Sequence, residues 1–276
     1  MAVLNAALRW LFDLALAPFA SWPAIVPVAL VSLAASVLML VLYKHTSNQK
    51  QLDAVKRRIH AGLFEIRLFN DDIRSIFRAL VEILRANGRY LGLSFVPMIF
   101  ILPPLALIMG QLEYHYGYQG LRPGQRFLLE CDLAPKAALS ARPQVTLDLP
   151  AGLRAEIGPA WFPSQSRLAW RLLAERDGSY QIGIAVDGAA RATKSVSVTS
   201  QAVRLSPLRV GPGFADQLLY PAEPPLASDS PVRAIRLDYP QRELSVLGHG
   251  MSWMIPFCGL SIVFAFALKG LFKVTL

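Results

Sequence analysis

The sequence predicts an α-helical membrane protein, with three transmembrane helices and a cytoplasmic helical hairpin, that carries an extracytoplasmic all-β domain of the immunoglobulin-like sandwich type. Of its 276 residues, 54% are hydrophobic, and the mean hydropathy is +0.39, which is too apolar for an ordinary soluble protein. Charged residues are absent from three long stretches. The segments between those stretches show helical spacing in one case and short alternating runs in the other.

The three stretches without Asp, Glu, Lys or Arg are Leu14–Tyr43, Tyr90–Leu112 and Leu244–Leu268. A hydrocarbon core of about 30 Å needs roughly 20 helical residues, so each stretch can cross it. We place the spans at 23–43, 90–112 and 248–268. Prolines within them are expected to kink or interrupt the helices. These are Pro23, Pro27, Pro97, Pro103, Pro104 and Pro256.

Residues 1–22 precede the first span and show a helical apolar pattern with few polar positions. The apolar positions are Leu4, Leu8, Leu11, Phe12 and Ala15. This pattern predicts an amphipathic helix in the membrane interface. A secretory signal peptide is the alternative, although Arg9 is the only basic residue before the apolar run and no small-x-small cleavage site follows a short core.

The distribution of Lys and Arg predicts the topology, because cytoplasmic loops retain these residues. Residues 44–89 contain ten of them in forty-six positions, whereas residues 113–243 contain fifteen, almost balanced by thirteen acidic residues. Lys269 and Lys273 place the tail, 269–276, on the same side as 44–89. We therefore expect a multi-pass protein of the cell (inner) membrane, with the N-terminus outside, the hairpin and C-terminus cytoplasmic, and 113–247 periplasmic or extracytoplasmic.

Residues 44–89 are expected to form a basic coiled-coil hairpin, because their apolar residues fall into two runs at helical spacing. The runs are Leu52, Val55, Ile59, Leu63 and Ile66, then Ile73, Ile76, Phe77, Leu80, Ile83 and Leu84. Asn70, Asp71 and Asp72 supply a turn and an N-terminal cap. Asn87 and Gly88 are expected to end the second helix before the membrane.

Four arginines of the hairpin are candidate docking residues for a ribosome, a membrane-protein client or another partner: Arg57, Arg58, Arg74 and Arg78. Arg74 and Arg78 lie one helical turn apart. In the alternative interpretation, the basic side chains only snorkel and solvate a coil beside anionic lipid. The net charge of +9 follows from the topology and the hairpin, so it gives no argument for binding a specific nucleic-acid sequence.

Residues 113–210 are expected to form the β domain, which could also dock stable partner subunits. Short alternating runs separated by turn signals such as Asp177-Gly178 and Asp187-Gly188 predict its strands. The runs are Phe127–Leu129, Val145–Leu149, Leu168–Leu172, Tyr180–Val186 and Val196–Val198. A Trp-containing strand at Trp170 followed by a hairpin with Tyr180 is typical of an immunoglobulin-like sandwich. Residues 211–247 are expected to be a Pro/Gly-rich linker with a final strand, Val232–Tyr239.

No catalytic motif, phosphate loop or metal-ligand pattern is found, so we expect no enzymatic activity, no catalytic residue, no metal site and no cofactor. A membrane-anchored enzyme remains the least favoured alternative. The polar residues within or beside the spans are Ser32, Ser36, Ser94, Gln111, Ser252 and Ser261. Either they bond to their own helix and help helices pack, or they line a hydrated groove.

Several segments resemble the YidC/Oxa insertase superfamily, over about the first 112 residues and the last span. Residues 51–58 (Gln-Leu-Asp-Ala-Val-Lys-Arg-Arg) resemble its first coil helix, and Asn70-Asp71-Asp72 resembles its coil turn. Val96-Pro97-Met98-Ile99, followed by Pro103-Pro104, is similar to the proline pattern of its next span. The order of parts is closest to the minimal three-span members, such as archaeal YidC-like proteins and the core insertase subunit of the eukaryotic membrane protein complex.

This resemblance implies an energy-independent membrane-protein insertase or chaperone that uses a hydrophilic groove between the spans. Two features differ from bacterial members of the family. No charged residue lies between Leu14 and Tyr43, where those members carry a groove arginine, and a β domain is inserted between the second and third spans. A non-catalytic accessory or scaffold subunit of a larger membrane complex, docking through its β domain, is therefore the alternative function.

Overall fold

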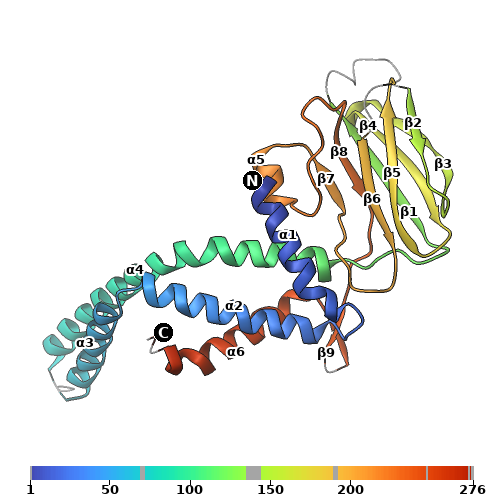
Figure 1. Ribbon diagram of the computed structural model, residues 1–276. Coiled ribbons are helices and arrows are strands. Elements are labelled where there is room, and N and C mark those ends of the chain that lie inside the picture. The colour runs from blue at the N-terminus through green and yellow to red at the C-terminus, as the bar shows by residue number, and fades with distance from the viewer. Residues whose placement is uncertain are drawn as a thin grey trace. The chain divides into compact units, whose positions relative to one another are not determined.

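The computed structural model describes residues 2–68, 72–134, 144–188, 192–246, 248–272 and 274. They fall into two compact units, and Figure 1 labels their elements. The β unit comprises Met1–Val28 and Met109–Ile255, and the helical unit comprises Ala29–Ile108 and Pro256–Leu276. Each unit is thus formed by two separate segments of the chain.

The helical unit is built from four helices: α2 (Ile25–Thr46), α3 (Gln49–Leu68), α4 (Ile73–Leu112) and α6 (Met254–Phe272). Within the described residues, three segments are helical, long and apolar enough to cross a membrane: Ile25–Thr46, Ile76–Gly117 and Met254–Phe272. Their number agrees with the prediction from hydropathy. Three helices of this length and hydropathy are typical of a membrane protein.

Helix α4 is one continuous helix of 40 residues. The predicted helix end at Asn87 and Gly88 is therefore wrong. A glycine inside a helix costs only about 1 kcal/mol relative to alanine, and Gly88 has open space around it and no positive φ. Pro97, Pro103 and Pro104 also lie inside α4 rather than dividing it.

The predicted hairpin is formed by α3 and the first half of α4, and both helices are capped at their N-termini. The Asn48 Oδ1 atom accepts a hydrogen bond from the Gln51 amide at 3.1 Å. The Asp72 Oδ1 atom accepts one from the Arg74 amide at 3.1 Å. Asp72 thus acts as the predicted cap, whereas Asn70 and Asp71 lie outside the described residues.

The seam between α3 and α4 is made from small and large apolar residues in equal number. The buried positions are Leu52, Val55 and Gly62 on α3, and Ala79, Ile83 and Ala86 on α4. A Cβ atom on Gly62 would lie 2.7 Å from Ile83 Cγ1, so the two helices approach closely there. The predicted apolar positions Leu63, Phe77, Leu80 and Leu84 are exposed instead. Helical spacing thus identified both helices and three of the seam residues, Leu52, Val55 and Ile83, but not the small residues between them.

The β unit contains two antiparallel sheets that share one core. Its strands are β1 (Arg126–Leu133), β2 (Val145–Asp148), β3 (Leu153–Phe162), β4 (Arg167–Ala174), β5 (Gly178–Val186), β6 (Ala192–Val198), β7 (Leu208–Val210) and β8 (Val232–Leu237). The five-stranded sheet has the order β3-β4-β1-β8-β7, and the three-stranded sheet has the order β2-β5-β6. Buried residues of both sheets, such as Leu129, Trp170, Ile184 and Val196, form one cluster.

All six predicted strands are present, but the end of the domain differs from the prediction. Strand β8 pairs with β1 on one side and β7 on the other, so it lies inside the five-stranded sheet. The segment predicted as a linker with a final strand therefore belongs to the fold of the β unit. Strands β9 (Leu244–Val246) and β10 (His249–Met251) form a hairpin before α6, where the prediction began the third span at 248. Gly248 has φ +83°, a conformation that favours glycine.

Helix α1 (Ala2–Leu16) also belongs to the β unit and is amphipathic, as expected. Its polar face contacts the segment around α5 (Phe214–Leu219). Asn5 donates a hydrogen bond to the Gln217 carbonyl at 2.6 Å, and Arg9 donates one to the Pro221 carbonyl at 2.9 Å. The opposite face exposes Trp10 and Leu14. A short 3-10 helix, Ala17–Phe19, follows α1.

Candidate functional site

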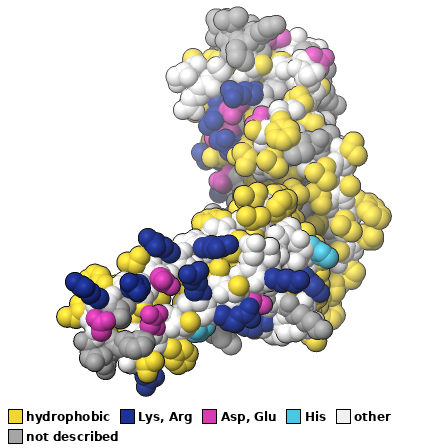
Figure 2. Space-filling model, turned by 90° about the vertical axis from the view of Figure 1, so that its left-hand side faces the viewer, with side chains coloured by type: hydrophobic (Ala, Val, Ile, Leu, Met, Phe, Trp, Pro, Cys, Tyr) yellow, Lys and Arg dark blue, Asp and Glu magenta, His cyan; other side chains and the backbone are white. Residues whose placement is uncertain are grey.

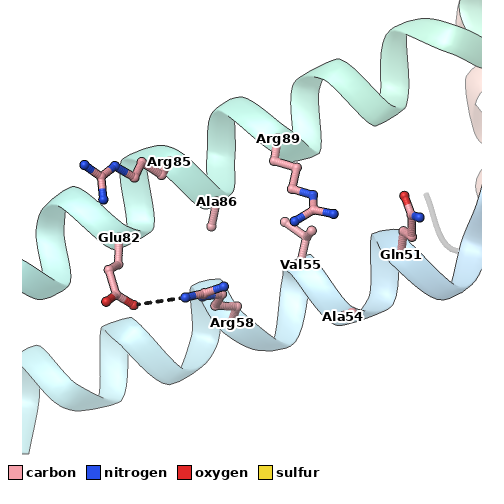
Figure 3. A pocket seen from close by; sticks show the side chains of 8 residues that line it. All are labelled: Gln51, Ala54, Val55, Arg58, Glu82, Arg85, Ala86 and Arg89. Carbon is pink, nitrogen blue, oxygen red and sulfur yellow. Dashed lines mark ion pairs between the residues drawn. The ribbon is translucent and has the colours of Figure 1, made fainter.

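A cleft with an excess of basic side chains lies between α3 and α4 and is called the basic cleft below. Its volume is about 300 Å³, and Figure 3 shows the side chains that line it. They are Gln51, Ala54, Val55, Arg58, Glu82, Arg85, Ala86 and Arg89. All of them belong to the helical unit.

Helical spacing explains how these residues come to face one cleft. Gln51, Val55 and Arg58 follow each other at four and three residues on α3, and Glu82, Ala86 and Arg89 do the same on α4. Residues at these intervals lie on one side of a helix. The small side chains of Ala54 and Ala86 leave the space between the helices open. The cleft is therefore a product of small residues on both helices flanked by long basic ones.

The charges of the basic cleft are only partly balanced. Arg58 Nη2 lies 3.7 Å from Glu82 Oε2, and both side chains are largely exposed, so this ion pair is weak. Arg85 and Arg89 make no hydrogen bond or ion pair with any residue in the described part of the chain. As like charges four residues apart on a helix, they repel each other. Figure 3 shows Arg89 reaching across the cleft toward Val55 of α3.

The surroundings of the basic cleft are also basic. Residues 44–89 contain ten Lys and Arg but only five Asp and Glu. Figure 2 shows Lys and Arg side chains gathered over the hairpin, in the lower part of the view. An anion near this surface would therefore be attracted from many directions.

Of the four predicted docking arginines, only Arg58 lines the basic cleft. Arg57, Arg74 and Arg78 are exposed elsewhere on the hairpin. The prediction missed Arg85 and Arg89. Their spacing of four residues around Ala86 was a visible signal, but the facing residues of α3 depend on how the two helices are aligned.

Three of the predicted groove residues are brought together, at a contact between α2 and α6 within the helical unit. The Ser32 hydroxyl donates to the Phe257 carbonyl at 3.3 Å. The Ser36 hydroxyl shares its proton between the Ser261 carbonyl of α6 at 2.9 Å and the Ser32 carbonyl of its own helix at 2.7 Å. Ser32 and Ser36 are buried. These serines thus sit where the two helices pack, as in the packing alternative.

The other three predicted groove residues are dispersed. The Ser94 hydroxyl donates to the Tyr90 carbonyl of its own helix at 2.9 Å, and Ser252 is exposed. Gln111 is buried in the β unit, where it accepts a hydrogen bond from Arg204 Nη1 at 2.8 Å. Four of the six residues thus belong to the helical unit, whereas Gln111 and Ser252 belong to the β unit.

Arg204 also anchors α1 within the β unit. Its Nε atom lies 2.8 Å from Asp13 Oδ1, and His115 Nε2 lies 3.0 Å from the same oxygen. Burial alone would raise the pKa of Asp13, but the His115 contact and the Arg204 charge hold it below its usual value. The ion pair between Arg204 and Asp13 thus has a structural role within the β unit.

Two adjoining hollows of about 460 and 640 Å³ lie on the β unit and share Arg167, Leu208, Tyr220 and Arg236. Arg167 and Arg236, which line both hollows, are paired with acidic side chains. Arg167 lies 2.6 Å from Asp132 and 3.2 Å from Glu130, and Arg236 lies 3.3 Å from Glu130. No group of three or more His, Cys, Asp or Glu that could hold a metal is found in the described residues. In the basic cleft, Arg85 and Arg89 remain available for a ligand and lie with Arg58 of the facing helix around one space.

Comparisons of the chain with protein-family models, curated proteins and solved structures found no match. The functional argument therefore rests on the residues and their geometry.

Proposed function

We propose that this protein is a YidC/Oxa-like insertase or chaperone of the cell (inner) membrane, which moves segments of client proteins into the bilayer without an energy source. The observation that carries the proposal is the continuity of α4. One helix begins in the basic hairpin and runs through a span whose most apolar window is only 6% buried. A surface that attracts polar client segments is thus joined directly to a surface open to lipid.

The proposed topology places the N-terminus outside, the hairpin and the C-terminus in the cytoplasm, and residues 113–247 outside. The excess of ten basic over five acidic residues in 44–89 supports this orientation. We also propose that the β unit is an immunoglobulin-like sandwich. Its two antiparallel sheets and their common core, which includes Trp170, support that assignment.

In the proposed mechanism, the hairpin receives a client or a ribosome through Arg57, Arg58, Arg74 and Arg78. The uncovered apolar faces of α4 and α6 then provide a side on which the client segment meets lipid; only 6% of the most apolar window of each is buried. Passage of polar groups through hydrocarbon costs several kcal/mol, and a hydrated, locally thinned bilayer lowers that cost. No covalent step is required.

A second candidate function is that of an accessory or scaffold subunit in a larger membrane complex. It is favoured by the position of Ser32, Ser36 and Ser261, which join α2 to α6 instead of lining an open surface. In that case, helices of partner subunits would cover α4 and α6, and the β unit would dock partner domains.

Insertion by the purified full-length chain in lipid vesicles tests the first function. A newly synthesised single-span client is offered, and its protection from protease is measured. The variant Arg57→Gln/Arg58→Gln/Arg74→Gln/Arg78→Gln should insert about tenfold less client. The matched control, Arg126→Gln/Arg154→Gln/Arg171→Gln/Arg233→Gln, removes the same charge from exposed positions of the β unit and should leave insertion unchanged.

Equal activity of the hairpin variant and the wild type would overturn the proposed role of the hairpin. Mass spectrometry of proteins that copurify in mild detergent then separates the two functions. Ribosomes and varied client proteins support an insertase, whereas a constant stoichiometric set of partners identifies a subunit of a defined complex.

A further inference from the structure

We propose that the basic cleft binds the phosphate group of an anionic membrane lipid and thereby fixes the depth of the hairpin at the bilayer surface. The ligand is assigned from the position of the cleft, its basic side chains and its size. The inference deepens the proposed function and rests on it for the placement of the hairpin beside the membrane. It adds a specific ligand and two residues, Arg85 and Arg89, that the docking role does not use.

The position of the cleft along α4 is the first argument. Glu82, Arg85 and Arg89 lie immediately before Tyr90, the first residue of the charge-free stretch. At about 1.5 Å per residue, Glu82 is about 12 Å from Tyr90 along the helix axis. The headgroup region extends roughly 5–8 Å beyond the hydrocarbon on each side. Because α4 is continuous, the cleft is fixed close to the level of lipid phosphates.

A contact between Lys56 and Tyr90 places α3 at the same depth as the start of the apolar part of α4. The Nζ atom of Lys56, on α3, lies 5.6 Å from the centre of the Tyr90 ring. This cation–π contact joins α3 to the residue at which the apolar part of α4 begins. Tyrosine is enriched at the level of lipid headgroups. Both walls of the cleft are therefore placed at the interface.

The chemistry of the cleft suits a phosphate. Arg58 and Arg89 approach from opposite helices, and Arg85 lies one turn from Arg89 (Figure 3). Planar guanidinium groups donate paired hydrogen bonds to phosphate oxygens. A bound anion would also remove the repulsion between Arg85 and Arg89. The volume of about 300 Å³ is at the lower end of the range of roughly 300–1,000 Å³ for small-ligand sites.

The composition of the cleft favours a lipid over a nucleic acid. Its lining contains no aromatic side chain on which a base could stack, and the apolar part is formed by Ala54, Val55 and Ala86. Binding of RNA by charge alone would use the whole basic surface of the hairpin and not one cleft. The matched variants below separate these cases.

The test uses the full-length chain in a neutral detergent, with phosphatidylglycerol as the probe and native mass spectrometry to count bound lipids. Arg58→Gln/Arg85→Gln/Arg89→Gln removes three charges from the cleft. Arg57→Gln/Arg74→Gln/Arg78→Gln removes the same number, also one from α3 and two from α4, but outside it. The cleft variant should lose affinity for one phosphatidylglycerol by about a hundredfold, and the outer variant by less than about threefold.

A variant that keeps every charge provides a second test. Ala54 is exposed at the cleft, so Ala54→Leu fills the space without entering the buried seam. It should weaken phosphatidylglycerol binding by about tenfold or more. Circular dichroism should show unchanged helix content in all three variants.

Several results would overturn the inference. These are equal losses in the two triple variants, no preference of the wild type for phosphatidylglycerol over phosphatidylcholine, binding of inorganic phosphate as tight as that of the lipid, or displacement of the lipid by a short RNA. Client insertion is measured in parallel. A wild type that retains the lipid but does not insert clients contradicts only the proposed function, and one that inserts clients without lipid preference contradicts only this inference.

Discussion

The β unit and the helical hairpin use charged side chains in opposite ways. In the β unit, Lys194 is completely buried, and its ammonium donates to the Ser206 carbonyl at 2.6 Å and to the Ser206 hydroxyl at 2.9 Å. It also pairs with Glu223, whose other oxygen accepts a hydrogen bond from the Ser195 amide at 2.9 Å. In the hairpin, Arg85 and Arg89 have no such partner within the described residues. Charges of the first kind hold the fold together, and charges of the second kind can hold a ligand.

Apolar residues show the same contrast. The β unit buries residues from both sheets in one core, whereas α4 exposes large apolar side chains such as Phe95 and Ile99. The β unit therefore supplies its own stabilising contacts. The spans depend on lipid or on another protein to cover them. Four changes test how far this contrast extends.

The largest effect is expected from Lys194→Met. Glu223 would remain buried without its cation, so the free energy of unfolding should fall by about 3–5 kcal/mol. Denaturant unfolding of the full chain in detergent, followed by tryptophan fluorescence, measures it, since Trp170 lies in the core.

The double variant Lys194→Met/Glu223→Gln removes both charges and should recover most of the loss. Arg126→Gln serves as the control, because the Arg126–Glu156 pair is exposed on the arginine side and should be worth at most about 1 kcal/mol. A double variant as unstable as Lys194→Met would show that the pair is not the source of the stability.

Acidification should remove part of the same stabilisation. Burial would raise the pKa of Glu223, but the Lys194 ammonium and the hydrogen bonds to the carboxylate hold it below the ordinary value of 4.5. A carboxyl whose pKa is lowered on folding stabilises the protein above its ordinary pKa, and this stabilisation is lost as the pH falls through the folded-state value. The unfolding midpoint should therefore decrease below pH 4.5.

Glu223→Gln should make that decrease smaller, as a series of unfolding curves at falling pH can show. Some acid dependence should remain in Glu223→Gln, because the pKa of Asp13 is also lowered on folding. Protonation of Asp13 therefore also destabilises the folded state as the pH falls. An identical acid dependence in the variant and the wild type would exclude Glu223 as its source.

A smaller effect is expected in the spans. Ser32→Ala/Ser36→Ala removes the two hydrogen bonds from α2 to α6, at about 0.6 kcal/mol each in membranes. Stability in mixed detergent should fall by about 1 kcal/mol. Thr46→Val is the control, because the Thr46 hydroxyl of α2 donates to the Leu42 carbonyl of the same helix at 2.7 Å. Equal losses of stability in both variants would show that the hydrogen bonds between α2 and α6 do not contribute more than a bond within one helix.

The smallest expected change is an increase in stability. Gly88→Ala should stabilise α4 by about 0.5–1 kcal/mol, because Gly88 lies in a helix with open space at its Cβ position. Amide hydrogen exchange across residues 80–92 measures it. Gly62→Ala, in the same hairpin, should destabilise, since its Cβ would meet Ile83. A loss of protection in Gly88→Ala would indicate that the helix ends there after all.

Much of the fold could be predicted because its signals are local. Charge-free stretches identified the spans, alternation identified six strands, and Asp72 identified a helix start. Strand β3 was missed because two register shifts, at Ala155/Ile157 and Ile157/Ala160, break its alternation. The place of β8 in the sheet could not be predicted from the sequence either. Its partner β1 lies far away in the sequence, and the Pro and Gly residues before β8 are typical of a loop.

The candidate site was predicted only in part, for a related reason. That the hairpin is basic follows from composition, but the cleft depends on which residues of α3 face Arg85 and Arg89. The predicted apolar runs contain Leu52, Val55 and Ile83, which are buried in the seam, but not Gly62, Ala79 and Ala86, which complete it. Close approach at small residues is a property of the pair of helices and is not visible in either one alone.

The place of β8 in the sheet also has a consequence for biosynthesis. About 100 residues separate β1 from β8, and at about 5–20 residues per second a ribosome needs on the order of 5 to 20 s to make them. During that time, the edge of β1 that β8 will occupy lacks its partner and can pair with other chains. Sixteen residues separate the end of β8 from the start of α6, so the sheet can close only shortly before α6 is made. Newly made chains therefore need protection of this edge until β8 has been made.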